Sequence, residues 1–164
     1  MLEVIGSALW FILPAYVANA TPVMAGGGRP LDRGRKLSDG EPIFGSGKTV
    51  RGLLAGIVAG SVVAIVQGIL TNSCKWPLVG LLLALGALVG DLIGSFIKRR
   101  LHIPRGRPAP LLDQLDFLLV ALLFASPLMI PSWQEIATLL IITPLIHLGT
   151  NAGAYALGLK KHPW

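Results

Sequence analysis

The feature that most restricts this chain is a series of five long apolar segments. They are Val4–Met24, Leu53–Leu70, Pro77–Ile97, Leu115–Pro131 and Glu135–Leu159. A helix needs about 20 mostly apolar residues to cross a bilayer, and these segments approach or exceed that length. Only 13% of the 164 residues are charged, against about 25% in a soluble domain. We therefore expect an all-α polytopic membrane protein, with five transmembrane helices in one domain covering residues 1–164.

Positive charge is distributed unevenly among the segments that connect these spans. The polar loops 25–51 and 98–112 hold six and five of the 14 Lys and Arg residues, and Lys160 and Lys161 follow the last span. Only Lys75 falls on the opposite side of a five-span chain. Because cytoplasmic loops carry the excess of Lys and Arg, we expect the N-terminus outside, the C-terminus in the cytoplasm, and both polar loops cytoplasmic. Residues 1–28 contain no Lys or Arg, so the first span is expected to be retained rather than cleaved as a signal peptide.

Glycine recurs every four residues in the second and third spans. The two rows are Gly52, Gly56 and Gly60, and Gly86, Gly90 and Gly94. Small residues at this spacing allow helix backbones to approach closely. The rows predict close packing of these spans against their neighbours.

The segment Gly45-Ser46-Gly47-Lys48-Thr49 in the first loop resembles part of a phosphate-binding P-loop. The complete pattern places a glycine where this chain has Pro42, and it follows a strand rather than preceding a membrane helix, so a true P-loop is excluded. Flexible backbone amides, a hydroxyl and an ammonium can nevertheless hold phosphate. Lys48, Ser46 and Thr49 are therefore candidate phosphate contacts. The alternative is a flexible, basic juxtamembrane loop.

Three aspartates form the most informative polar set. Asp91 lies inside the third span, where a charged residue costs about 2.5–3.5 kcal/mol on insertion and usually marks function. Asp113 and Asp116 stand one helical turn apart at the start of the fourth span. If the ends of these two spans meet, the three carboxylates could hold Mg²⁺, which prefers oxygen ligands. The alternatives are a structural ion pair between Asp91 and a snorkelling base, and a helix cap at Asp113 and Asp116.

Basic and hydroxyl side chains accompany these carboxylates. Ser95 and Lys98 follow Asp91 on one helix face, and Arg99 and Arg100 extend the basic run. Carboxylates that hold a metal, next to bases that stabilise a leaving pyrophosphate, are what nucleotidyl transfer requires. The predicted catalytic residues are Lys48, Asp91, Lys98, Asp113 and Asp116.

Two further groups of polar residues lie within the spans. Asn19 and Thr21, near the inner end of the first span, are candidates for contacts with a substrate base. His147, Asn151 and Tyr155 form a polar stripe in the fifth span. For the stripe, interhelical hydrogen bonding and participation in chemistry both stay open.

Two motifs together resemble the signatures of the CDP-diacylglycerol synthases (phosphatidate cytidylyltransferases). They are Ser95-x-x-Lys98-Arg99 with Asp113-x-x-Asp116, and Gly47-Lys48-Thr49-x-x-Gly52. The small size and three further strings resemble the archaeal branch, the CDP-archaeol synthases. These strings are Asn19-Ala20-Thr21-Pro22-Val23, Asp39-Gly40 and Gly158-Leu159-Lys160. The bacterial signature has one further acidic residue and a Pro-Gly-His-Gly-Gly run, where this chain has Leu101–Leu112.

The resemblance implies that CTP and 2,3-bis-O-geranylgeranylglycerol 1-phosphate react to CDP-archaeol and pyrophosphate at the cytoplasmic face of the cell membrane. It implies Mg²⁺ as cofactor, which we expect on Asp91, Asp113 and Asp116. The expected substrate contacts are Asn19, Thr21, Ser46, Thr49, Ser95, Arg99 and Arg100. The partners expected are CTP, the lipid phosphate and the bilayer, without nucleic acid, and homodimerisation stays open. The alternative functions are a synthase for ester lipids, a small glycerol-phosphate acyltransferase, and a non-enzymatic transporter or assembly subunit.

Overall fold

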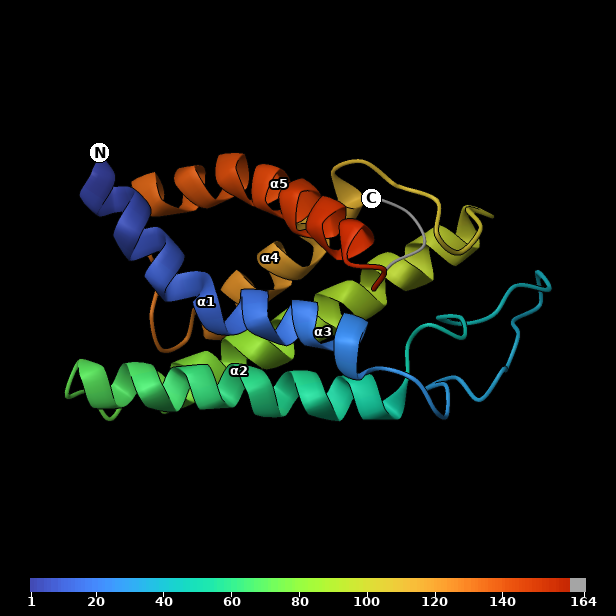
Figure 1. The fold of residues 1–164 in the computed structure, drawn as a ribbon, viewed down its shortest axis with the longest axis horizontal. Helices are drawn as coiled ribbons and strands as arrows, with labels where there is room; N and C mark the ends of the chain where they lie inside the picture. Colours follow the sequence, from blue (N-terminus) through green and yellow to red (C-terminus); the bar gives the residue numbers. More distant parts are fainter. Residues whose placement is uncertain (160–164) are drawn as a thin grey trace.

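The fold consists of five α-helices, seen in a computed structural model that describes residues 1–159 (Figure 1). The helices are α1 (Leu2–Ala25), α2 (Val50–Leu70), α3 (Trp76–Arg100), α4 (Leu112–Ala125) and α5 (Trp133–Ala156). Helices α1, α2, α3 and α5 are long and apolar enough to cross a membrane, whereas α4 has only 14 residues. The all-helical prediction is confirmed. Lys160 and Lys161, which the predicted charge asymmetry includes, lie outside the described residues.

Local sequence signals explain where two of these helices begin and end. Thr49 caps α2, because its Oγ1 atom accepts a 3.1 Å hydrogen bond from the backbone N–H of Gly52. Helix α5 starts with a capping box formed by Ser132 and Glu135. It ends before Gly158, whose φ of +72° suits a left-handed C-terminal residue. The fifth helix therefore stops at Ala156, three residues before the predicted end of its span.

Helix α4 differs most from its predicted span of residues 115–131. It begins at Leu112 and ends at Ala125. Pro127 has no N–H to donate to the carbonyl oxygen of Leu123, so the helical ladder stops there. The hydroxyl of Ser126 donates a 2.8 Å hydrogen bond to that carbonyl instead. The apolar run continues past this point, but residues 126–128 form a turn.

The two glycine rows pack as predicted. A methyl group added at Gly56 would lie 2.7 Å from the carbonyl oxygen of Ala18 in α1. One added at Gly60 would lie 2.6 Å from the Cβ atom of Ala84 in α3. The second row lets α3 lie directly against α4, since a methyl group at Gly86 would approach the backbone of α4 to 2.7 Å. Close approach at these positions places α3 at the centre of the bundle.

A buried polar contact joins α1 to α2. Pro14 lies inside α1 and cannot donate to the carbonyl oxygen of Trp10, which would accept the next helical hydrogen bond. The Nε2 atom of Gln67 in α2, a side chain that is 1% exposed, donates a 2.6 Å hydrogen bond to this oxygen. A side chain of one helix thus supplies the donor that the other helix lacks.

The remaining core lies between α1, α3, α4 and α5, around Ile12, Leu83, Leu118 and Leu139. Helices α2 and α5 lie on opposite sides of this core (Figure 1). The loop of residues 26–49 and the loop of residues 101–111 lie at the same end of the bundle (Figure 1). This end carries the candidate functional residues.

Candidate active site

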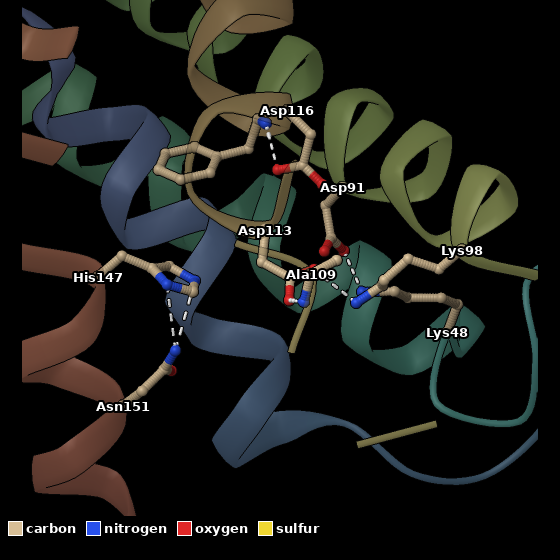
Figure 2. Close-up of polar contacts among 9 residues, drawn as sticks. Lys48, Asp91, Lys98, Ala109, Asp113, Asp116, His147 and Asn151 are labelled. Carbon is tan, nitrogen blue, oxygen red and sulfur yellow. Dashed lines mark hydrogen bonds and ion pairs between the residues drawn. The ribbon is translucent and has the colours of Figure 1, made fainter. Parts of the chain in front are cut away.

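A lysine from the first loop contacts the aspartate inside α3. The Nζ atom of Lys48 lies 2.5 Å from the Oδ2 atom of Asp91, and both side chains are 28% exposed. Figure 2 shows the two groups pointing toward each other. Asp91 therefore pairs with a base, but the base comes from another segment of the chain. It is not Lys98, which follows Asp91 on the same helix.

A second lysine–aspartate pair joins the end of α3 to the start of α4. The Nζ atom of Lys98 lies 2.6 Å from the Oδ1 atom of Asp113. The other carboxylate oxygen of Asp113 accepts a 2.8 Å hydrogen bond from the backbone N–H of Ala109. Both oxygens of Asp113 are thus engaged, and its orientation is fixed by the loop that precedes α4.

The third aspartate lies between α4 and α3. The Oδ1 atom of Asp116 accepts a 2.6 Å hydrogen bond from the N–H of Phe117. Its Oδ2 atom lies against Gly94, where a Cβ atom would overlap it. The charges of Asp91, Lys48 and Asp113 all act on Asp116. The ends of α3 and α4 therefore meet (Figure 2). Gly94 of α3 makes room for the carboxylate.

The donor atoms of the three carboxylates differ in their availability to a metal ion. Among residues 1–159, no three His, Cys, Asp or Glu side chains lie close enough to hold a metal ion together. The Oδ1 atom of Asp91 and the Oδ2 atom of Asp116 make no hydrogen bond or ion pair within that range. Mg²⁺ commonly binds one or two carboxylates and completes its shell with substrate phosphates and water. Two hard oxygen donors fit that arrangement.

Asp32 organises the loop that carries Lys48, a role that the sequence analysis did not identify. Its carboxylate accepts hydrogen bonds from the backbone N–H groups of Gly34 (3.0 Å), Phe44 (3.0 Å) and Gly45 (2.8 Å), and the residue is 5% exposed. Burial alone raises the pKa of Asp32, but these hydrogen bonds outweigh it and lower the pKa below its usual value. The local contact to Gly34 is a turn pattern readable from sequence, whereas the contacts 12 and 13 residues away are not.

The predicted hydroxyl contacts have different surroundings. Thr49 caps α2 through its Oγ1 atom, as described above. Ser46 accepts a 2.9 Å hydrogen bond from the Nη1 atom of Arg105 in the second loop. Thr21 donates a 2.7 Å hydrogen bond to the carbonyl oxygen of Val17 in its own helix. Ser95 is buried on α3, four residues from Asp91, while Asn19 is half-buried on α1.

The two arginines at the end of α3 are not equivalent. The Nη1 atom of Arg100 lies 2.5 Å from the Oδ2 atom of Asp39, and its guanidinium lies 5.2 Å from the ring centre of Phe96. Arg99 is buried and makes no side-chain hydrogen bond or ion pair with any residue in 1–159. Arg100 therefore holds the first loop against α3, whereas Arg99 makes no polar contact with that loop within residues 1–159.

Of the polar stripe of α5, His147 takes part in interhelical packing, whereas Tyr155 is exposed. The His147 ring stacks on Phe117, the residue after Asp116, at a centroid distance of 6.4 Å. The Nδ2 atom of Asn151 lies 3.1 Å from the Nδ1 atom of His147 (Figure 2). One turn earlier, the hydroxyl of Thr143 lies 2.7 Å from that of Tyr16 in α1. These contacts attach α5 beside the aspartates.

Comparison with known proteins gives a clear family assignment. A sequence model described as CarS-like: CDP-archaeol synthase matches residues 1–164. The chain belongs to this family. A CDP-archaeol synthase of Thermococcus gammatolerans is 55% identical, with 96% of this chain and 95% of the relative covered. One of Pyrococcus horikoshii is 52% identical, with the same coverage of both chains.

The fold comparison agrees with this assignment. A solved structure described as an intramembrane enzyme for archaeal membrane lipids biosynthesis matches with a TM-score of 0.84 and 47% identity. The match covers 90% of this chain and 94% of that one. The predicted family is confirmed, and with it an enzyme of the lipid-phosphate cytidylyltransferase class. The four long apolar helices and this structural relative also support a multi-pass membrane protein.

Proposed function

We propose that this chain transfers the cytidylyl group of CTP to 2,3-bis-O-geranylgeranylglycerol 1-phosphate and releases pyrophosphate. The names of relatives that are 52 and 55% identical support this activity. The structural observation that carries the proposal is the meeting of two lysine–aspartate pairs at one end of the bundle. Lys48 and Asp91 come from the first loop and α3, and Lys98 and Asp113 join α3 to α4.

The proposed topology has five crossings, with the N-terminus outside and the C-terminus in the cytoplasm. Helix α4 and the turn that follows it form the fourth crossing in this arrangement. The segments 25–51 and 98–112, which include the two loops at the site end and the adjoining helix ends, hold 11 of the 14 Lys and Arg residues, and this bias supports a cytoplasmic site in the cell membrane. A lipid phosphate at that surface keeps its isoprenoid chains in the bilayer, while CTP arrives from the cytosol.

The proposed chemistry needs no general base, because the attacking group is already an ionised phosphate. An oxygen of the lipid phosphate attacks the α-phosphorus of CTP, and the bond from this phosphorus to the bridging oxygen breaks. Lys48 and Lys98 leave their aspartates and contact phosphoryl oxygens, so that each ammonium exchanges one anion for another. Ammonium groups held in place before the reaction stabilise the charge that develops on the leaving pyrophosphate.

The proposed metal ligands are Asp91 and Asp116, joined by Asp113 when Lys98 turns to a phosphate. Bound there, Mg²⁺ would neutralise phosphate charge and orient the reacting groups. Asp91 and Asp116 suit this role because each presents one carboxylate oxygen without a partner in residues 1–159. Gly94, which has no side chain, leaves room for the Asp116 carboxylate against α3.

The remaining predicted contacts have secondary roles in this proposal. Ser46 and Ser95 contact phosphate, and Asn19 and Thr21 remain the candidates for reading the cytosine base. Thr49 and Arg100 act on the substrate indirectly, since the first caps α2 and the second holds the loop. Homodimerisation stays a prediction.

The proposal is tested with purified chain, labelled CTP and ether-linked or ester-linked phosphatidic acids. We expect CDP-lipid and pyrophosphate in equal amounts with the unsaturated ether lipid, and loss of turnover with EDTA that Mg²⁺ restores. Asp113→Asn should lose turnover, whereas Glu3→Gln at the exposed N-terminus should keep it. Turnover that persists in EDTA, or a preference for saturated ester lipid, would contradict the proposal.

A further inference from the structure

The residue that precedes α4 has an unusual backbone conformation. Leu111 has a φ of +66° and a ψ of −43°. These angles are close to those of the classic γ-turn, which is rare and strained. The other three non-glycine residues with positive φ among residues 1–159 are polar: Arg33, Asn72 and His102. A bulky apolar side chain at positive φ is an outlier that calls for a functional explanation.

The turn at Leu111 has a structural use, but that use does not require a leucine. The carbonyl oxygen of Leu111 accepts the first hydrogen bonds of α4, from the N–H groups of Gln114 (3.3 Å) and Leu115 (2.9 Å). Across the same turn, the carboxylate of Asp113 reaches back to the N–H of Ala109. Glycine adopts positive φ without the steric cost of a Cβ atom. The turn alone would therefore favour glycine, so the leucine side chain itself has to contribute.

The side chain of Leu111 does not pack into the protein core, since it is 65% exposed. It begins a row of leucines that continues along α4 with the exposed Leu119 (52%) and Leu123 (67%). The half-buried Leu115 completes the row, whose members are spaced four residues apart and share one side of the helix. An exposed apolar row on a membrane helix contacts lipid chains, which are as apolar as leucine. Leu111 extends this row to the very end of α4.

Contact with lipid can offset the strain at Leu111. The cost of positive φ for a residue with a Cβ atom is similar in size to the gain from removing a leucine side chain from water. The conformation is therefore tolerable if the side chain enters an apolar layer, and unfavourable if water surrounds it. Arg105 and Arg107, a few residues earlier, are exposed, and their charged groups stay on the polar side of the interface. The border of the apolar layer then falls between Arg107 and Leu111.

We propose that the side chain of Leu111 is inserted into the apolar layer of the membrane, where it contacts lipid chains and fixes the depth of this end of α4. Leu111 precedes Asp113 by two residues, and Asp113 is tied to the same turn through Ala109. Leu111 is thus a positioning residue, which holds the Asp113 carboxylate at the level of the lipid phosphates. Its kinetic effect rests on the proposed function, whereas its insertion does not.

The first test measures the depth of Leu111 without turnover. In full-length protein with Cys74→Ser, which removes the exposed native thiol, a spin label is attached to Leu111→Cys, Arg107→Cys or Leu119→Cys. Each protein is reconstituted into vesicles of diphytanyl-ether phosphatidylglycerol. Collisions of the label with oxygen, which concentrates in lipid, are compared with collisions with a water-soluble nickel chelate. The label at position 107 is the reference for water, and the label at position 119 is the reference for lipid.

The label at position 111 should collide with oxygen as often as the label at position 119 does, and it should be protected from nickel to the same extent. If nickel reaches position 111 as readily as position 107, the side chain lies in water and the proposal is overturned.

The second test measures the positioning effect by kinetics in the same vesicles, without a label. Leu111→Gly removes the side chain and the strain together, so the turn itself is kept. The KM for the lipid phosphate should rise about tenfold, within the range that a misplacement on the order of 1 Å costs, while the KM for CTP stays unchanged. Leu111→Met keeps an apolar side chain and should retain the wild-type lipid KM. Wild-type kinetics in Leu111→Gly, or equal rises in both KM values, would overturn the positioning role.

The two proposals can fail separately. If the wild-type protein transfers no cytidylyl group but the label at position 111 lies in lipid, the membrane contact holds and the proposed function fails. If turnover is normal but the label at position 111 lies in water, the function holds and the membrane contact fails.

Discussion

The Nζ atom of Lys48 lies 2.5 Å from the Oδ2 atom of Asp91, and this contact connects the loop before α2 to the interior face of α3. The two residues are 43 positions apart in the chain. In the absence of substrate, the ammonium balances a carboxylate that would otherwise sit unpaired in a membrane-embedded helix. An arriving phosphate can replace the carboxylate as the partner of the lysine, so the net cost of freeing Lys48 is small.

Replacing Lys48 with methionine tests this exchange. We expect Lys48→Met to lower the rate of cytidylyl transfer by about 10²–10³-fold, the usual effect of removing a preorganised electrostatic contact. Membrane insertion should be normal, because the loops keep most of their positive charge. Lys36→Met removes the same charge from an exposed position of the same loop and serves as control. Equal rates for the two variants would show that only the overall charge of the loop matters.

The contact between Gly94 and Asp116 predicts a steric effect on the metal site. A methyl group at Gly94 would overlap the Oδ2 atom of Asp116, so Gly94→Ala must push the carboxylate aside. Overpacking of this kind costs about 1–3 kcal/mol. The variant should melt earlier in detergent and need more Mg²⁺ for half-maximal turnover. Gly149→Ala, where no atom lies within 4 Å, should melt at or slightly above the wild-type temperature. If both alanine variants behave alike, the close approach of α3 and α4 is wrong.

Asp32 predicts a dependence of loop stability on pH. Its folded-state pKa is lowered, so its contribution is fully present above the unfolded value of about 3.9 and is lost as the pH falls through the lower folded value. Asp32→Asn should reduce stability by about 1–3 kcal/mol near neutral pH. The difference from wild type should shrink as the pH drops below about 4. Melting curves at several pH values measure this. If the difference in stability between wild type and Asp32→Asn stayed constant down to the lowest pH measured, the ionised carboxylate of Asp32 would not be its source.

The contact from Gln67 to Trp10 can be tested by a double-mutant cycle with Pro14. Gln67→Leu leaves the buried carbonyl of Trp10 without a donor, which should cost about 1–3 kcal/mol. Pro14→Ala restores a helical N–H at the position that would bond to this carbonyl. In the Pro14→Ala background, Gln67→Leu should therefore cost clearly less, as measured by thermal unfolding in detergent. Equal costs in both backgrounds would mean that Gln67 stabilises α1 by packing alone.

Much of the helical layout is readable from the sequence, because apolar length alone identifies a membrane helix. The predicted spans 53–70 and 77–97 lie within α2 and α3. The fourth helix shows the limit of this reasoning. Hydropathy continues smoothly past Ala125, but Pro127 removes a backbone donor and the helix ends. The length of an apolar run therefore does not fix where its helix ends.

The three aspartates could be picked out from the sequence as candidates, but their pairings could not. Asp91, Asp113 and Asp116 stand out because carboxylates in or beside membrane spans are rare. Their partners depend on which loop folds onto which helix, and the pairing of Asp91 with Lys48 has no local signal. Neighbouring residues of the same type also cannot be told apart from the sequence. In the structure Arg99 is buried, whereas Arg100 is less buried and pairs with Asp39.

The 14 residues of α4 have a consequence for the bilayer itself. At 1.5 Å per residue the helix is about 21 Å long, some 9 Å shorter than a hydrocarbon layer of about 30 Å. Such hydrophobic mismatch is relieved by local thinning of the membrane. In the proposed five-crossing topology, a bilayer thinned around α4 would bring the headgroup plane down toward Asp113, in the first turn of this helix, and Asp116, one turn further on. A lipid phosphate would then meet these carboxylates at the depth where it already resides, without its isoprenoid chains being lifted into water.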